Sequence, residues 1–76
     1  MNHYTLFGTE GCHLCEDAAA LLVAANLTFE SVDIIDDAIA WQRYSTRIPV
    51  LFNPENEQEL NWPFDAMQLR SFVTGQ

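Results

Sequence analysis

The stretch that decides the fold is residues 3–15, which read His-Tyr-Thr-Leu-Phe-Gly-Thr-Glu-Gly-Cys-His-Leu-Cys. The aromatic, β-branched and aliphatic side chains at 3–7 predict a buried strand, and glycines bound a predicted loop over 8–11. Over 12–25, small and apolar side chains recur every three or four positions, which predicts a helix. The two cysteines of the chain therefore lie where a strand passes through a loop into a helix.

The rest of the chain predicts three more strands and two more helices. The strands are expected over 28–34, 48–52 and 57–61. Asp36 or Asp37 can cap a short helix that runs to about Tyr44, and the capping-box spacing of Asp65 and Gln68 marks the start of the last helix. Strands joined through the first helix must be parallel with a right-handed crossover, and the short turn before the fourth strand makes the last pair antiparallel. We therefore predict an α/β fold with a four-stranded mixed sheet, in one domain over 1–76.

The charge of the chain excludes some partners. Three arginines and no lysine stand against eleven acidic residues, giving a net charge of −8. Nucleic acid and anionic membrane surfaces bind through basic footprints, so neither is an expected partner. The N-terminus lacks the pattern of a signal peptide, and no stretch approaches the roughly 20 apolar residues of a membrane span. We therefore expect a cytoplasmic protein, and in that compartment the cysteine pair would normally be reduced and available for chemistry.

The cysteine pair forms a C-x-x-C motif at the predicted start of a helix. There the unpaired N–H groups and the positive end of the helix dipole favour a thiolate on Cys12. Such sites can lower a thiol pKa from about 8.5 to between roughly 3.5 and 7.5, and the thiolate is the nucleophile. Cys15 lies one turn further in and could resolve a mixed disulfide on Cys12. The motif therefore predicts thiol–disulfide exchange, with Cys12 and Cys15 as the catalytic residues.

Other interpretations of these residues stay open. Structural zinc usually takes four ligands, and the chain offers only Cys12, Cys15, His13 and His3 as cysteine or histidine candidates. His13 adjoins both cysteines, and His3 begins the first strand, so we expect no bound metal and no tightly bound cofactor. His13 could stabilise the thiolate as an imidazolium or simply fill the space between the cysteines. A binding domain with an idle motif is a further alternative.

On these features the chain resembles the glutaredoxin branch of the thioredoxin superfamily over nearly its full length. The resemblance rests on the C-x-x-C motif after the first strand, the order of elements, and Ile48-Pro49 at the third strand. Segments 15–18, 47–50 and 60–65 are similar to those of very small bacterial glutaredoxin-like proteins without an assigned substrate. The resemblance implies a thioredoxin-like sheet of order 2-1-3-4 with helices on both faces.

The resemblance also implies how a substrate is held. In that superfamily the proline corresponding to Pro49 is cis and faces the cysteine pair, and the backbone of Ile48 pairs with the substrate like a short strand. A trans proline that starts an edge strand is the alternative. The expected partner is first a disulfide-containing protein and second a glutathione mixed disulfide. Some glutaredoxins bind an iron–sulfur cluster between two protomers, which keeps a metal-carrier function open.

Several residues bear on whether glutathione binds. Glutathione-binding relatives usually carry a basic residue just before the cysteine pair, where this chain has Thr9 and Glu10. They also carry a Gly-Gly turn before the last helix, where this chain reads Trp-Pro-Phe at 62–64. Asp65 matches an acidic position of the family. Glutathione is therefore expected only as a candidate co-substrate.

The remaining candidates are basic and aromatic side chains. Arg47 or Arg43 could hold a substrate carboxylate or lower the pKa of Cys12, with a surface ion pair as the alternative. Trp41 and Trp62 would either flank a substrate groove or belong to the core. We expect the protein to act as a monomer. The predicted substrate-binding residues are His13, Arg47, Ile48, Pro49 and Asp65.

Overall fold

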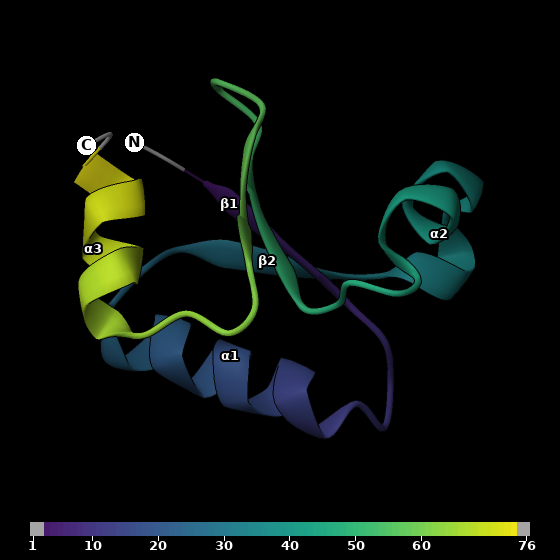
Figure 1. The fold of residues 1–76 in the computed structure, drawn as a ribbon, viewed down its shortest axis with the longest axis horizontal. Coiled ribbons are helices and arrows are strands. Elements are labelled where there is room, and N and C mark those ends of the chain that lie inside the picture. The colour runs from purple at the N-terminus through teal and green to yellow at the C-terminus, as the bar shows by residue number, and fades with distance from the viewer. Residues whose placement is uncertain (1–2, 75–76) are drawn as a thin grey trace.

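The computed structural model describes residues 3–74, and its centre is a four-stranded mixed sheet (Figure 1). The sheet has the order β2-β1-β3-β4. Strand β1 pairs in parallel with β2 and antiparallel with β3, and β3 pairs antiparallel with β4. The strands span Tyr4–Gly8 (β1), Phe29–Asp33 (β2), Val50–Asn53 (β3) and Gln58–Asn61 (β4). The predicted α/β class, mixed sheet and strand order are confirmed.

Three α-helices and one short 3-10 helix connect these strands. They span His13–Ala24 (α1), Ile34–Asp36 (η1), Ala38–Tyr44 (α2) and Ala66–Thr74 (α3). The predicted caps are present: the Asp37 carboxylate accepts the N–H groups of Ile39 and Ala40 at 2.9 and 3.1 Å. Asp65 and Gln68 each accept the other's backbone N–H, at 2.8 and 3.0 Å. Within residues 3–74, no helix is long and apolar enough to cross a membrane.

The helices cover both faces of the sheet, as the resemblance implied. Helices α1 and α3 lie together on one face, and α2 lies at the other (Figure 1). Neighbouring strand residues alternate between two buried clusters: Leu6 and Leu51 pack with α1 and α3, whereas Phe7 and Val50 pack with α2. Each face of the sheet therefore has its own apolar core. The buried members of the larger cluster are Tyr4, Leu6, Ala18, Leu22, Leu51, Phe64 and Leu69.

The two tryptophans have different surroundings. Trp62 packs against the larger cluster, with its ring 5.0 Å from that of Phe64 in an edge-to-face arrangement. Trp41 lies on α2 and is 52% exposed. The core interpretation is confirmed for Trp62 and is wrong for Trp41, because α2 turns its buried side to the sheet through Ala40 and Tyr44.

Some boundaries differ from the sequence expectation. Ile34 was expected to end a strand but begins η1, because the Asp33 carboxylate accepts the N–H of Ile35 at 3.0 Å and turns the chain. The third strand begins at Val50, two residues later than expected, since Pro49 has no N–H to give to a ladder. The Trp62–Pro63 peptide is cis, which no sequence pattern indicated.

Candidate active site

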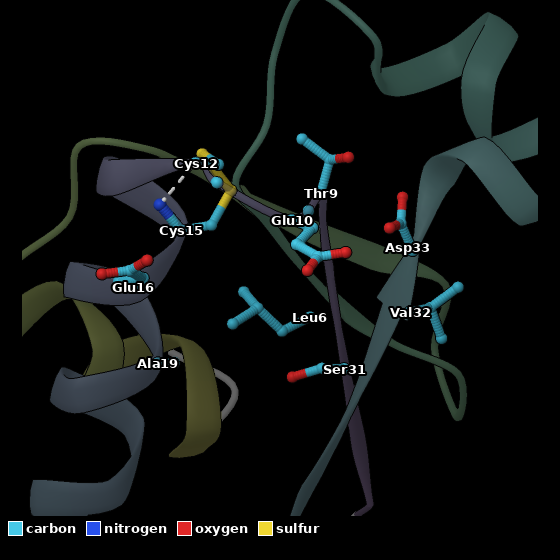
Figure 2. Close-up of a pocket in the computed structure, with 12 residues that line it drawn as sticks. Leu6, Thr9, Glu10, Cys12, Cys15, Glu16, Ala19, Ser31, Val32 and Asp33 are labelled. Carbon is cyan, nitrogen blue, oxygen red and sulfur yellow. Dashed lines mark hydrogen bonds between the residues drawn. A yellow bond between two sulfur atoms is a disulfide. The ribbon is translucent and has the colours of Figure 1, made fainter.

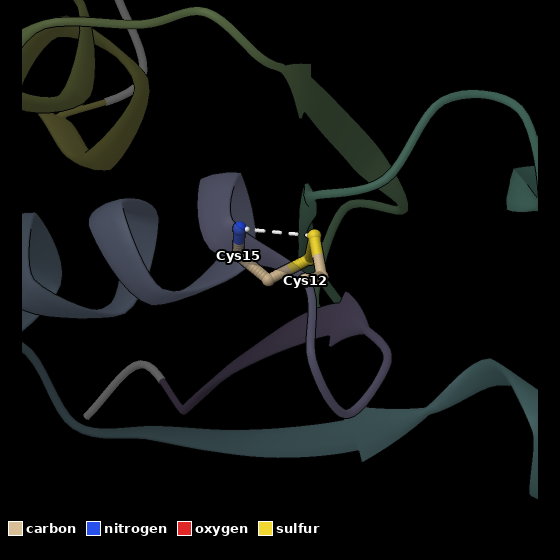
Figure 3. Close-up of a disulfide and its surroundings, with 2 residues drawn as sticks. All are labelled: Cys12 and Cys15. Carbon is tan, nitrogen blue, oxygen red and sulfur yellow. Dashed lines mark hydrogen bonds between the residues drawn. A yellow bond between two sulfur atoms is a disulfide. The ribbon is translucent and has the colours of Figure 1, made fainter.

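The cysteine pair lies at the junction of β1 and α1, and its two sulfurs are joined in a disulfide (Figure 3). Their Cα atoms are 5.2 Å apart. Cys12 is the N-cap of α1, with extended backbone at φ −83° and ψ 111°, and its Sγ accepts the N–H of Cys15 at 3.1 Å. An oxygen of Ser, Thr, Asp or Asn usually fills this place. Here the first turn of the helix directs an N–H group at a sulfur instead.

The two cysteines differ in exposure. Cys15 is 9% exposed, whereas Cys12 is half-buried. The N-terminal end of α1 is directed at Cys12, since the N–H of Cys15 donates to its sulfur. An approaching partner would therefore meet Cys12 first, with Cys15 behind it.

Gly8, the last residue of β1, makes room for this arrangement. A Cβ atom at Gly8 would lie 2.8 Å from Cys15 Sγ and 3.1 Å from Cys15 Cβ, closer than side chains normally approach. Only a residue without a side chain fits there while Cys15 keeps its position. Sequence reasoning identified this glycine only as a loop signal, because its contact with Cys15 depends on how β1 and α1 pack.

Pro49 lies at the same end of the sheet as the cysteines. The Ile48–Pro49 peptide is cis, as the resemblance implied. Val50 pairs with Phe7 in the antiparallel register, so the next position along each strand places Pro49 opposite Gly8. The side chain of Cys15 lies against Gly8. Ile48 is half-buried and packs on the α2-side cluster. The fold thus brings Ile48-Pro49 and the cysteine pair, separated by more than 30 positions in the sequence, to one edge of the sheet.

A cavity of about 370 Å³ adjoins the disulfide (Figure 2). It lies between α1 and the β1–β2 side of the sheet, and both cysteines line it. Leu6 and Ala19 contribute apolar surface, and the acids Glu10, Glu16 and Asp33 also line it. No basic side chain of residues 3–74 is among the lining residues, and sequence reasoning did not foresee this cavity.

Arg47 is held by side chains of β4. Its guanidinium forms an ion pair with Glu59 at 3.2 Å and donates to Asn61 Oδ1 at 3.1 Å. It also lies over the ring of Tyr44, with 5.1 Å from Cζ to the ring centroid. The structure therefore contains the surface ion pair that was the alternative for Arg47. A contact between Arg47 and a substrate stays a prediction.

The same network shifts two pKa values. Tyr44 donates its hydroxyl to Glu59 at 2.6 Å. Burial, together with this hydrogen bond, raises the pKa of Tyr44 above 10.0. The hydrogen bond from Tyr44, helped by Arg47, lowers the pKa of Glu59 below 4.5. The hydrogen bond and the ion pair that cause these shifts connect the end of α2 to β4. The cysteines take no part in these contacts.

The other candidates from the sequence do not gather at one place in the fold. His13 is the exposed first residue of α1. Asp65 is exposed and caps α3. His3 lies at the far end of β1 from the cysteines, 3.9 Å from a carboxylate oxygen of Glu30. Within the part of the chain that the structure describes, no three side chains of the types His, Cys, Asp or Glu converge as a metal site.

Comparisons with known proteins agree with this geometry. Residues 3–74 match the family described as Glutaredoxin-like domain (DUF836). The X-ray structure of the structural genomics target XcR50 from X. campestris is 42% identical, with a TM-score of 0.86 over 96% of this chain and 97% of that one. Protein Ne2328 from Nitrosomonas europaea, solved by NMR, is 28% identical, with a TM-score of 0.81 over 93% of this chain and 89% of that one. No curated protein matches the chain.

Proposed function

Because the chain belongs to the glutaredoxin-like family, we propose that it is a thiol–disulfide oxidoreductase whose cysteine pair passes between dithiol and disulfide. One observation carries the proposal: the two sulfurs are within bonding distance at the start of α1, with Cys12 the more accessible. A purely structural disulfide would add little to the stability of the fold here. The loop between residues three apart is short, so closing it removes little entropy from the unfolded state.

The proposed reaction moves two electrons from the dithiol to a substrate disulfide. The Cys12 thiolate attacks one substrate sulfur, and the other leaves as a thiolate that takes up a proton. Cys15 then loses its proton and attacks the Cys12 sulfur of the mixed disulfide, which releases the second substrate thiolate. The domain is left as the disulfide, the substrate as a dithiol, and a thiol reductant restores the starting form.

The residues around the pair would hold the substrate. We propose that the backbone of Ile48, beside cis-Pro49, pairs with the substrate chain across the cysteines. His13 would contact the substrate from the exposed first turn of α1. Arg47 would have to leave its present partner Glu59 to bind a substrate carboxylate. Asp65 would have to leave the Gln68 backbone N–H to accept a hydrogen bond from an N–H group of the substrate.

We propose a disulfide-containing protein as the substrate, in preference to a glutathione mixed disulfide. Glutathione is an anion with two carboxylates, and the acids beside the disulfide, Glu10, Glu16 and Asp33, would repel it. We place the reaction in the cytoplasm, where reductants keep such a pair available, and expect a monomer to suffice because both cysteines belong to one chain.

A redox titration combined with trapping tests the proposal. The protein is equilibrated with dithiothreitol buffers of graded potential, and alkylation with mass spectrometry counts its free thiols. We expect one two-electron transition. Cys15→Ser should accumulate a mixed disulfide with a model peptide disulfide, whereas Cys12→Ser should not. A pair that never cycles, or equal trapping by both variants, contradicts the proposal, and visible absorbance after anaerobic iron–sulfide reconstitution would favour a cluster carrier.

A further inference from the structure

We infer that the cavity beside the Cys12–Cys15 pair accepts a lysine or arginine side chain of the substrate polypeptide. The domain would then prefer disulfides flanked by basic residues. This inference rests on the proposed function and names the substrate class of that same site. Three features carry it: the shape of the cavity, its charge, and its position relative to the reactive sulfurs.

The lining of the cavity suits a long basic side chain. Leu6 and Ala19 provide apolar surface, along which the methylene stem of lysine or arginine can lie. The carboxylates that line the cavity come from three separate segments: Glu10 from the loop after β1, Glu16 from α1 and Asp33 from the end of β2 (Figure 2). A cationic head in the cavity could form a charge-assisted hydrogen bond with one of these carboxylates.

Two of these carboxylates are not neutralised by the protein. Within residues 3–74, no salt bridge involves Glu10 or Glu16, and Asp33 accepts only the N–H of Ile35. The arginines of the chain lie elsewhere: Arg47 pairs with Glu59, and Arg43 and Arg70 belong to α2 and α3. With a net charge of −8 overall, the mouth of the site attracts cations.

The position of the cavity lets one polypeptide use both sides of the site. Strand β1 leads into the cysteines and lies between β2 and β3 in the sheet. The cavity is on the β2 side and Ile48-Pro49 on the β3 side. A substrate chain that crosses the sulfurs beside Ile48 would therefore extend a neighbouring side chain toward the cavity.

Two synthetic peptides test this inference. They share one intramolecular disulfide and differ only in carrying two arginines or two glutamates beside the cysteines. Each is mixed with one equivalent of the dithiol protein at pH 7, and acid-quenched samples give the second-order rate constants. At low ionic strength we expect the arginine peptide to react at least about tenfold faster. The ratio should fall toward one at about 1 M salt, where the Debye length is about 3 Å.

Variants identify the carboxylates responsible. Glu10→Gln/Glu16→Gln should reduce the ratio of the two rate constants several-fold, and a ratio is insensitive to any change in the thiolate fraction of Cys12. Asp36→Asn/Glu57→Gln removes the same charge from exposed positions outside the cavity and should keep the ratio of the unmodified protein. Equal losses in both double variants would overturn the assignment to the cavity.

The outcomes separate this inference from the proposed function. If an uncharged disulfide such as 2-hydroxyethyl disulfide is reduced but the two peptides react equally, or the glutamate peptide reacts faster, only the inference fails. If no disulfide is reduced and no mixed disulfide is trapped, the proposed function fails as well.

Discussion

The contact between Gly8 and Cys15 leads to a prediction that links packing to redox chemistry. In Gly8→Ala the new methyl group would lie 2.8 Å from Cys15 Sγ and 3.1 Å from its Cβ. Overpacking of this kind costs about 1–3 kcal/mol. A domain of 76 residues has a free energy of unfolding of only about 4–11 kcal/mol. We therefore expect a lower unfolding midpoint, by about 4–8 °C for each kcal/mol lost.

The loss should depend on the redox state. In the disulfide form, Cys15 Sγ is fixed by its bond to Cys12 and cannot move away from the methyl group. In the dithiol form, the thiol can turn to another staggered rotamer, so only the Cβ contact remains. Each 1 kcal/mol of difference between the forms raises the reduction potential by about 20 mV, since 30 mV corresponds to about 1.4 kcal/mol. Gly8→Ala should thus make the pair more oxidising.

Urea unfolding of both redox forms, with a dithiothreitol equilibrium for the potential, measures these effects. The matched control is Gly11→Ala, where φ is +80° and a Cβ would meet no atom within 4 Å. Its cost, about 1–2 kcal/mol for a left-handed residue, should be equal in the two forms and leave the potential unchanged. Equal destabilisation of both forms by Gly8→Ala, with an unchanged potential, would refute the reasoning.

Three further predictions concern stability. The pKa of Glu59 is lowered in the fold, so its stabilising contribution is present above its unfolded value of 4.5 and is lost as pH falls through the lower folded value. Glu59→Gln should therefore lose less stability than the unmodified protein between pH 5 and pH 3 in urea titrations, and an unchanged pH dependence would contradict this. Asp37→Ala removes the cap of α2 and should cost about 1 kcal/mol, a cost that Asp37→Asn should largely avoid. Leu22→Ala opens a cavity under α1 and should cost about 2–5 kcal/mol by calorimetry, whereas the exposed neighbour Val23→Ala should cost less than about 0.5 kcal/mol.

Short-range signals predicted much of this fold. The helix starts at Asp37 and Asp65 depend on hydrogen bonds within three residues, which a sequence displays directly. The position of the cysteine pair followed in the same way from the order of a strand, a glycine loop and a helical pattern. The sheet order and the cis isomer at Pro49 came from the resemblance, because local pattern does not fix either.

What the sequence did not predict depends on segments that meet only in the fold. The cavity beside the cysteines combines residues from β1, α1 and β2. The need for glycine at position 8 comes from a side chain seven positions away. The partners of Arg47, Glu59 and Asn61, belong to a strand that pairs with β3 only after folding. The sequence could not identify these partners, so Arg47 remained a candidate for substrate binding.

The hydrogen bond from the Cys15 amide to the Cys12 sulfur gives the domain its own spectroscopic reporter. The proton of that amide senses the electron density of the sulfur directly. Its NMR chemical shift should therefore take separate values for the thiol, the thiolate, the mixed disulfide and the internal disulfide. Following this one resonance through a titration would identify each state of the exchange cycle without a label.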